Sequence, residues 1–190
     1  MSSTVLYMSM SLDGFIAGPD ETPDNPLGDG GYRLHDWDFT ATSSGANRVV
    51  YDEFNATGAI VAGSGTFEPA GGWGGDHHDG VPIYILSRHP APDWTTDWPL
   101  VHYGNDLDAA FRGAKAAAGD KNVLVHGAAV AQRALRAGLL DELEIHLIPV
   151  LLGGGRALFG ELGIGQRELE RVRVLEADGG VTHLRFRVRR

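Results

Sequence analysis

The chain has 190 residues, of which 43% are hydrophobic and 22% charged, and its net charge at pH 7 is −9. This composition is that of an ordinary globular protein, so we expect a single domain spanning residues 1–190. The negative charge argues against nucleic acid or an anionic membrane as a partner. The absence of cysteine excludes disulfides, thiolate zinc sites and a cysteine nucleophile. No leader-like or long apolar segment is found, and we therefore expect a cytoplasmic protein.

The N-terminal segment predicts a strand followed by a long loop. Residues 4–11 (TVLYMSMS) alternate so that Val5, Tyr7 and Ser9 share one face. Residues 18–38 are rich in Pro, Gly and Asp and lack an apolar period, which is typical of a loop that covers a binding site. The aromatic side chains of this region either anchor the loop or stack on a ligand; they are Tyr32, Trp37 and Phe39.

A helix is predicted from Thr42 to Asn55, with Thr42 or Ser43 as its cap and Ala46, Val50 and Phe54 on its buried face. Asp52 on this helix is a candidate catalytic acid. The alternative is that Asp52 belongs to the solvated face, as most helical carboxylates do.

Three predicted strands end in turns that suit an anion. The apolar run at residues 59–63 leads into Ser64-Gly65-Thr66-Phe67, residues 81–87 end at Ser87-Arg88, and residues 123–125 lead through His126-Gly127 into a helix. Each turn alone resembles any strand-to-helix connection, because neither GxGxxG nor a Walker lysine is present. Because the carboxyl ends of parallel strands meet at one edge of a sheet, three such turns predict an extended, phosphate-bearing cofactor.

Two further segments complete the pattern. The adjacent His77 and His78 lie in a glycine-rich loop without nearby partners at ligand spacing, so we expect no metal. Residues 181–188 alternate between polar and apolar side chains and predict an outer or edge strand. The order of elements predicts an α/β domain with a mostly parallel sheet, flanking helices and antiparallel C-terminal strands.

Four stretches carry a resemblance to a known family: MSLDGFIAG, AIVAGSGTFE, IYILSR, and the block with GLLDELEIHLIPVLLGGG. They resemble the dihydrofolate-reductase-like superfamily, and more closely its branch related to the C-terminal reductase domain of bifunctional riboflavin-biosynthesis deaminase/reductases. The resemblance implies a mainly parallel sheet of about eight strands, NADPH as hydride donor, and homodimers. Residues 138–152, read as an apolar edge strand, are the expected surface of self-association.

The resemblance also implies roles for individual residues. The nicotinamide is expected against Ser9, Ile16 and Ala17, and the adenosine ribose and its 2′-phosphate against Ser87 and Arg88. The phosphates are expected at the two glycine turns, with Phe67 as a packing neighbour; these turns comprise Gly63, Ser64, Gly65, Thr66, His126, Gly127, Ala128, Ala129 and Val130. The peptide bond before Gly127 is expected to be cis, which is costly for a non-proline residue.

The departures from the family pattern matter as well. The acid of a true dihydrofolate reductase falls at Asn47, and an amide cannot supply the carboxylate that protonates a pterin. Asn47 and Tyr51 become candidate substrate contacts, and water or Asp52 the proton source. Because Ser64 and Ala129 stand where basic residues are often found, Arg88 is the main candidate for the 2′-phosphate, with NADH as the alternative donor.

These observations predict an NADPH-dependent reductase that transfers hydride to a pterin- or pyrimidine-like C=N or C=O bond and is not a dihydrofolate reductase. The alternative is a non-catalytic dimeric module that binds a nucleotide or small ligand, which the missing carboxylate favours. The side chain of His126 either lines the cofactor cleft or merely fills its turn.

Overall fold

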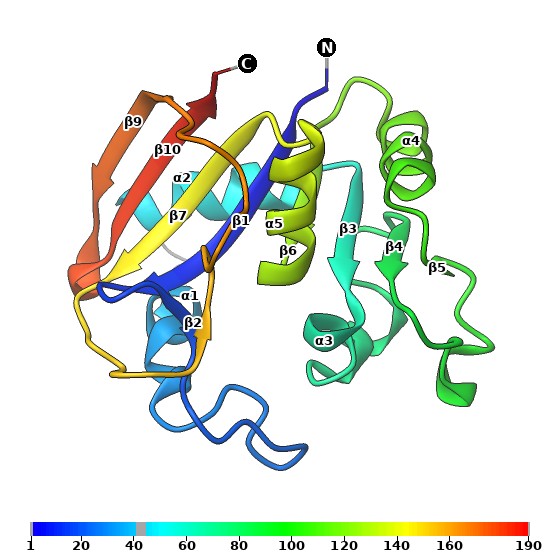
Figure 1. The fold of residues 1–190 in the computed structure, drawn as a ribbon, viewed down its shortest axis with the longest axis horizontal. Helices are drawn as coiled ribbons and strands as arrows, with labels where there is room; N and C mark the ends of the chain where they lie inside the picture. Colours follow the sequence, from blue (N-terminus) through cyan, green and yellow to red (C-terminus); the bar gives the residue numbers. More distant parts are fainter. Residues whose placement is uncertain (1, 41–44, 190) are drawn as a thin grey trace.

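A computed structural model describes residues 2–40 and 45–189, and its centre is an eight-stranded sheet in the order β5-β4-β3-β6-β1-β7-β10-β9 (Figure 1). The pairs from β5 to β7 are parallel, and β10 is antiparallel to both of its neighbours. The strands are β1 (Thr4–Ser11), β3 (Ala59–Gly63), β4 (Ile83–Leu86), β5 (Val101–Gly104), β6 (Val123–His126), β7 (Glu142–Ile148), β9 (Leu169–Glu176) and β10 (Thr182–Val188). The predicted α/β architecture is confirmed. A separate pair joins β2 (Phe15–Ala17) to β8 (Arg156–Ala157).

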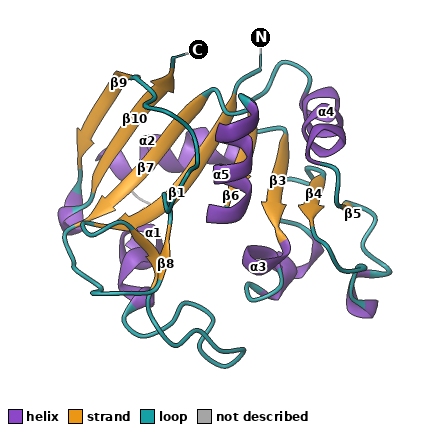
Figure 2. Cartoon of the chain, in the orientation of Figure 1, coloured by secondary structure: helices purple, strands orange, loops and turns teal. Residues whose placement is uncertain are grey.

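Helices cover both faces of the sheet (Figure 2). The longer ones are α2 (Gly45–Asn55), α4 (Leu107–Ala118) and α5 (Ala128–Ala137). The short ones are α1 (Asp36–Thr40), α3 (Ser64–Phe67), η1 (Gly31–His35), η2 (Gly71–Gly75), η3 (Asp93–Thr95) and η4 (Asp178–Gly180). The central strands are apolar on both faces because both faces are covered.

Alternate residues of the central strands therefore enter two different cores. Val123 and Val125 pack with Phe111 of α4 and Val130 of α5. Leu124, between them, packs on the opposite face with Phe67 of α3. A third cluster joins Trp37 and Val50 to the sheet and fixes α1 and α2 on this second face. At the start of α4, the Asp106 carboxylate accepts the Ala109 N–H at 3.0 Å and so caps the helix.

Three expectations about strands and loops are wrong. Residues 18–38 are not a loop throughout, because η1 and α1 begin at Gly31 and Asp36. β10 is not an edge strand, since β9 covers its outer side. β7 lies between β1 and β10, so residues 138–152 do not offer a free strand edge for self-association.

The predicted helix at residues 42–55 is present as α2, but its buried face differs in part. Asn47 and Val50 are buried, whereas Ala46 and Phe54 are only partly so. The proposed caps Thr42 and Ser43 lie outside the described residues. Within the described part of the chain no peptide bond is cis, so the cis bond expected before Gly127 is not found; Gly127 instead adopts a φ of 90°. None of the helices in residues 2–40 and 45–189 is long and apolar enough to cross a membrane.

A pair of fully buried histidines lies where the parallel part of the sheet, which ends at β7, meets the antiparallel strand β10. His146 of β7 and His183 of β10 are cross-strand partners whose Nδ1 atoms lie 2.8 Å apart, and His183 Nε2 lies 2.8 Å from Asn47 Oδ1. The rings of Tyr7 and Trp37 pack on His146. Burial lowers the pKa of His183 to about 4 and lowers that of His146 as well. The pair is therefore uncharged in the folded protein, and the polar face predicted for residues 181–188 is in part a core face.

This burial predicts a pH-dependent stability. Because the pKa of His183 falls from about 6.5 in the unfolded chain to about 4 in the fold, the unfolded chain binds a proton first as pH falls. The free energy of unfolding should then decrease from pH 6.5 towards pH 4, by up to about 1.4 kcal/mol per pH unit for this histidine. His183→Gln keeps a donor for Asn47 but cannot gain the proton. Urea unfolding at pH 7.5, 6 and 5 should show the variant less stable at pH 7.5, with the deficit narrowing at pH 5.

His89→Gln, at an exposed position, serves as the control and should follow the wild-type pH profile. If the curves of wild type and His183→Gln stay parallel between pH 7.5 and pH 5, the histidine pair is not the source of the dependence.

Candidate functional site

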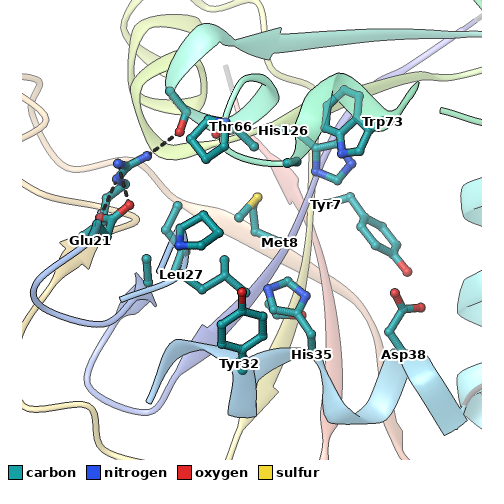
Figure 3. A pocket seen from close by; sticks show the side chains of 18 of the residues that line it. Tyr7, Met8, Glu21, Leu27, Tyr32, His35, Asp38, Thr66, Trp73 and His126 are labelled. Atoms are coloured by element: carbon teal, nitrogen blue, oxygen red, sulfur yellow. Dashed lines mark hydrogen bonds and ion pairs between the residues drawn. The ribbon is translucent and has the colours of Figure 1, made fainter. Parts of the chain in front are cut away.

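A cavity of about 510 Å³ opens beside the carboxyl ends of β1, β3 and β6, on the face that carries α1 and α2 (Figure 3). Strand β1 provides its floor through Tyr7, Met8 and Ser9, and the end of β6 provides His126. The remaining lining residues come from surrounding segments; they are Ile16, Ala17, Glu21, Pro26, Leu27, Tyr32, His35, Trp37, Asp38, Phe54, Gly65, Thr66, Pro69, Ala70, Trp73, His77 and Arg156.

One wall of the cavity is the loop between β2 and η1. The Gly18 N–H donates to the Leu27 carbonyl and the Asp29 N–H donates to the Pro19 carbonyl, each at 2.8 Å, so the loop folds compactly on itself. A Cβ atom at Gly28, whose φ is 65°, would overlap the carbonyl of Gly18, which explains a glycine there. The loop is thus built to present Glu21 and Leu27 to the cavity.

Arg156 connects this loop to the first glycine turn. Its Nη2 lies 2.7 Å from Glu21 Oε2, its Nε donates to Glu21 Oε1 at 3.1 Å, and its Nη1 donates to the Gly65 carbonyl at 2.9 Å. Arg156 was not predicted as a site residue, although a basic residue directly after Gly153-Gly154-Gly155 was an available signal.

A second groove, of about 380 Å³, continues from the cavity and shares Gly65, Thr66 and Arg156 with it. Its other lining residues include the start of α5, namely Gly127, Ala128, Ala129 and Val130. No side chain caps the N-terminus of α5, so its first N–H groups face the groove without such a partner. A Cβ at Gly127 would overlap Thr66 Oγ1, so the two turns approach as closely as glycine allows. The donor set and the space fit a pyrophosphate.

A carboxylate that was not predicted from the sequence faces the cavity. Asp38 of α1 points toward the hydroxyl of Tyr7 (Figure 3). Asp38 remains exposed to solvent over part of its surface, but partial desolvation raises its pKa, against the opposing effect of His35, and burial lowers the pKa of His35. Burial raises the pKa of Tyr7 well above its usual range, and the charge of Asp38 adds to the shift. Asp38 is the carboxyl group best placed to exchange a proton inside the cavity.

Two further histidines line the cavity beside Trp73. Their burial lowers the pKa of His126 to about 4 and that of His77 to about 2, so both are uncharged at neutral pH. Of the two alternatives for His126, the one in which it lines the cleft agrees with the structure. His77 and His78 contact one another through their Nδ1 atoms at 2.8 Å. Among the described residues no cluster suited to a metal ion is found.

Trp73 reaches the cavity through an unusual backbone turn. Gly72, Trp73 and Gly74 all have φ between 51° and 65°, and such a value is uncommon for a bulky residue. The turn packs closely against Trp98 and Phe67. Glycine is needed at positions 72 and 75 because a Cβ atom at either would collide with the Trp98 ring. Phe67 is fully buried in this aromatic cluster, which agrees with its expected packing role.

The structure brings most of the predicted cofactor residues together. Ser9, Ile16, Ala17, Gly65, Thr66 and His126 line the cavity, and Gly63 and the first residues of α5 line the adjoining groove. Ser9 is fixed by the Trp37 Nε1–H, which donates to its Oγ at 2.9 Å. Ser64, Ser87 and Arg88 lie at the same edge of the sheet but line neither space. Ser87 Oγ donates to the His89 carbonyl at 2.9 Å, and Arg88 is exposed.

The three candidates on α2 lie away from the cavity. Asn47 is buried against His183, and Tyr51 stacks beside Phe54. Asp52 is exposed and pairs with Arg48 at 2.7 Å. The structure therefore does not place Asp52 where it can act on a ligand in the cavity, because the helix turns that residue toward solvent.

Comparisons with known proteins agree with this fold. The family model of the RibD C-terminal domain matches residues 3–183, and a search of curated proteins returns no match. Among solved structures, a putative riboflavin biosynthesis protein from Shewanella sp. PV-4 has a TM-score of 0.72 at 22% identity, with 99% of each chain covered. A pyrimidine reductase-like protein from Corynebacterium diphtheriae has a TM-score of 0.70 at 16% identity, covering 100% of this chain and 92% of that chain.

A third neighbour is a two-function protein from Thermotoga maritima, a diaminohydroxyphosphoribosylaminopyrimidine deaminase and 5-amino-6-(5-phosphoribosylamino)uracil reductase. Its TM-score is 0.66 at 14% identity, and the match covers 99% of this chain but only 57% of that chain. These identities show a shared fold, and the resemblance expected from the sequence is confirmed.

The contact between the two glycine turns yields a testable prediction. Gly127→Ala should destabilise the protein by about 1–3 kcal/mol, because the new Cβ meets Thr66 Oγ1 and φ is 90°. Gly138→Ala is the matched control, since Gly138 ends the same helix at a φ of 67° with open space around it. Denaturant unfolding should show the larger loss for Gly127→Ala. Adding Thr66→Ala should recover part of that loss, and failure to recover any of it would contradict the proposed contact.

Proposed function

The chain belongs to the RibD C-terminal domain family, and we propose that it is an NADPH-dependent reductase that reduces a C=N or C=O bond in a small pyrimidine- or pterin-like ring. The observation that carries the proposal is the continuity of the cavity with the groove at the start of α5 through Gly65, Thr66 and Arg156. A long, phosphate-bearing cofactor and a small flat substrate together need such a bent, two-part space.

The residues present fit a pyridine nucleotide, which supplies a hydride ion when bound. The uncapped N–H groups at residues 128–130 suit the pyrophosphate, with Arg156 beside them. Ser9, Ile16 and Ala17 line the cavity where a nicotinamide would meet the substrate. Ser87 and Arg88, at the end of the neighbouring strand β4, are the candidates for the adenosine end and its 2′-phosphate.

The protein itself positions the cofactor and the substrate, limits the access of water and supplies one proton. Hydride addition to a C=N or C=O carbon leaves the nitrogen or oxygen in need of a proton. Asp38, whose pKa partial desolvation raises, is the candidate group to supply that proton from the cavity wall. Tyr7, Phe54 and Trp73 form an apolar wall that limits water around the reacting groups.

Asp38 also bears on the choice between a reductase and a binding module. The strongest support for a non-catalytic module was the amide at Asn47, where a dihydrofolate reductase has its acid. A carboxyl group from α1 instead reaches the cavity, so the absence of an acid at Asn47 no longer argues against catalysis. The pyrimidine reductase-like neighbour supports a pyrimidine ring as the substrate.

Titration with NADPH, followed by quenching of tryptophan fluorescence, tests the cofactor assignment. Trp73 lines the cavity, so saturable quenching is expected. Arg88→Ala should weaken NADPH binding about 10-fold or more, as loss of a charged hydrogen bond to phosphate implies, and should leave NADH binding nearly unchanged. Oxidation of NADPH in the presence of an aminopyrimidine, followed at 340 nm, then tests reduction.

Arg112→Ala, which removes an exposed arginine from α4, is the control and should bind NADPH as the wild type does. Absence of binding by both nucleotides at millimolar concentration would rule out the nicotinamide assignment. Saturable NADPH binding without oxidation by any aminopyrimidine would favour the binding module instead.

We also propose that the protein forms a homodimer, and that the edge strand β9 takes part. β9 ends the sheet, and its apolar side chains Leu169, Val172 and Val174 are more than 40% exposed. An outer strand with apolar side chains invites pairing with a second copy.

Light scattering coupled to gel filtration tests the dimer. Val172→Asp together with Val174→Asp should shift the mass from dimer towards monomer, because charges replace apolar contacts at the edge. Val49→Asp, at an equally exposed valine of α2, should leave the mass unchanged. A monomeric wild type, or a dimer that survives the paired change, would contradict the role of β9.

A further inference from the structure

The cavity has few positive charges. Among the described residues that line it, Arg156 is the single lysine or arginine. Both Nε and Nη2 of Arg156 contact the Glu21 carboxylate, and Nη1 donates to the Gly65 carbonyl. Its charge is therefore balanced by Glu21, and its guanidinium lies at the junction with the α5 groove. The part of the cavity away from this junction, bordered by Tyr7, Trp73 and Asp38, is called its inner half below (Figure 3).

The inner half of the cavity offers no other cation. His35, His77 and His126 all line it, and burial lowers the pKa of each, so none is a protonated partner for an anion at neutral pH. Residues 39–44, which follow Asp38 in the sequence, are FTATSS and include no basic side chain. Asp38 itself repels an anion whenever it is ionised.

The walls of the inner half are instead shaped for a flat, apolar-faced ring. The rings of Tyr7, Tyr32 and Trp73 come from three separate elements and border the space (Figure 3). Between them stand a few polar groups suited to the edge of a heterocycle, namely Ser9 Oγ, His35 and Asp38. Phosphate binding sites, in contrast, are built from arginine, lysine or clustered backbone N–H groups.

We propose that the substrate of this protein is a flat nitrogen heterocycle without a phosphate group, bound in the inner half of the cavity by aromatic contacts and by hydrogen bonds to Asp38, His35 and Ser9. This substrate class rests on the proposed function, since it assumes that the groove at α5 holds the cofactor. It differs from the phosphoribosylated substrate in the name of the Thermotoga maritima neighbour. The phosphate sites of this chain serve the cofactor alone.

A matched pair of ligands tests the proposal directly. The probes are 5-amino-6-(5-phosphoribosylamino)uracil and the same molecule after removal of its phosphate, titrated calorimetrically into the protein saturated with NADP⁺. The dephosphorylated compound should bind at least about tenfold more tightly, because a phosphate dianion gains no cation there and meets Asp38. Equal or tighter binding of the phosphorylated compound would overturn the proposal, as would failure of both compounds to bind.

The charge of Asp38 gives a second readout that a purely structural role would not produce. Asp38→Asn should reduce the ratio of the two dissociation constants several-fold, because the phosphorylated ligand should bind more tightly to the variant. Asp108→Asn, which removes a carboxylate from the exposed face of α4, should leave the ratio unchanged. A ratio that is the same in Asp38→Asn and Asp108→Asn would contradict the role of Asp38.

A failure of the proposed substrate class can be distinguished from a failure of the proposed reductase function. NADPH binding is measured first and independently by fluorescence. If NADPH does not bind, the proposed function fails, yet the same two ligands titrated into the cofactor-free protein still report whether the cavity rejects phosphate. If NADPH binds and the phosphorylated ligand is preferred, the reductase assignment stands and the substrate class proposed above fails.

Discussion

The parallel pairing of β4, β3, β6 and β1 is the constraint on which the rest of the structure depends. Parallel neighbours must be joined by crossovers, so the turns that leave these strands all emerge at one edge of the sheet. The cavity and the groove at α5 occupy that edge. Small residues are needed there because two turns, at Thr66 and Gly127, approach one another closely. The site follows from the topology first and from individual side chains second.

The charge state of the site is set by burial more than by ion pairing. Desolvation holds in their neutral forms the histidines whose rings lie in or beneath the cavity, namely His35, His77, His126, His146 and His183. The same low polarity raises the pKa of Asp38. A cavity with uncharged histidines, in which Glu21 is paired with Arg156 and Asp38 is the candidate proton source, is consistent with hydride chemistry, in which water competes with the productive proton transfer.

The parts of the fold that could be predicted are those encoded locally. The apolar runs at residues 59–63 and 123–125 identify buried strands, and the glycines after them identify the turns. β9 was missed because its sequence, LERVRVLE, alternates arginine and glutamate with apolar residues that remain exposed. The burial of His183 was not predictable either, since it depends on the register that sets this residue opposite His146.

The site was predicted where one turn defines it and missed where distant segments meet. Gly65, Thr66 and Gly127 follow from their own strand ends. Asp38 lies in a segment without an apolar period, and its position depends on how η1 and α1 pack on the sheet through Leu34 and Trp37. No local pattern places that carboxylate beside Tyr7. Asp52 was favoured instead because it lies on the more regular helix.

Arg156 joins segments that are far apart in the chain, since Glu21 lies 135 positions before it and Gly65 lies 91 positions before it. In an unfolded chain such groups rarely meet, because closing long loops costs conformational entropy. The wall formed by the loop at residues 18–30 is therefore held in place by a contact that only a nearly full-length chain can make. A fragment ending before β8 would retain most of the parallel strands but would lack the residue that fastens this wall to the first glycine turn.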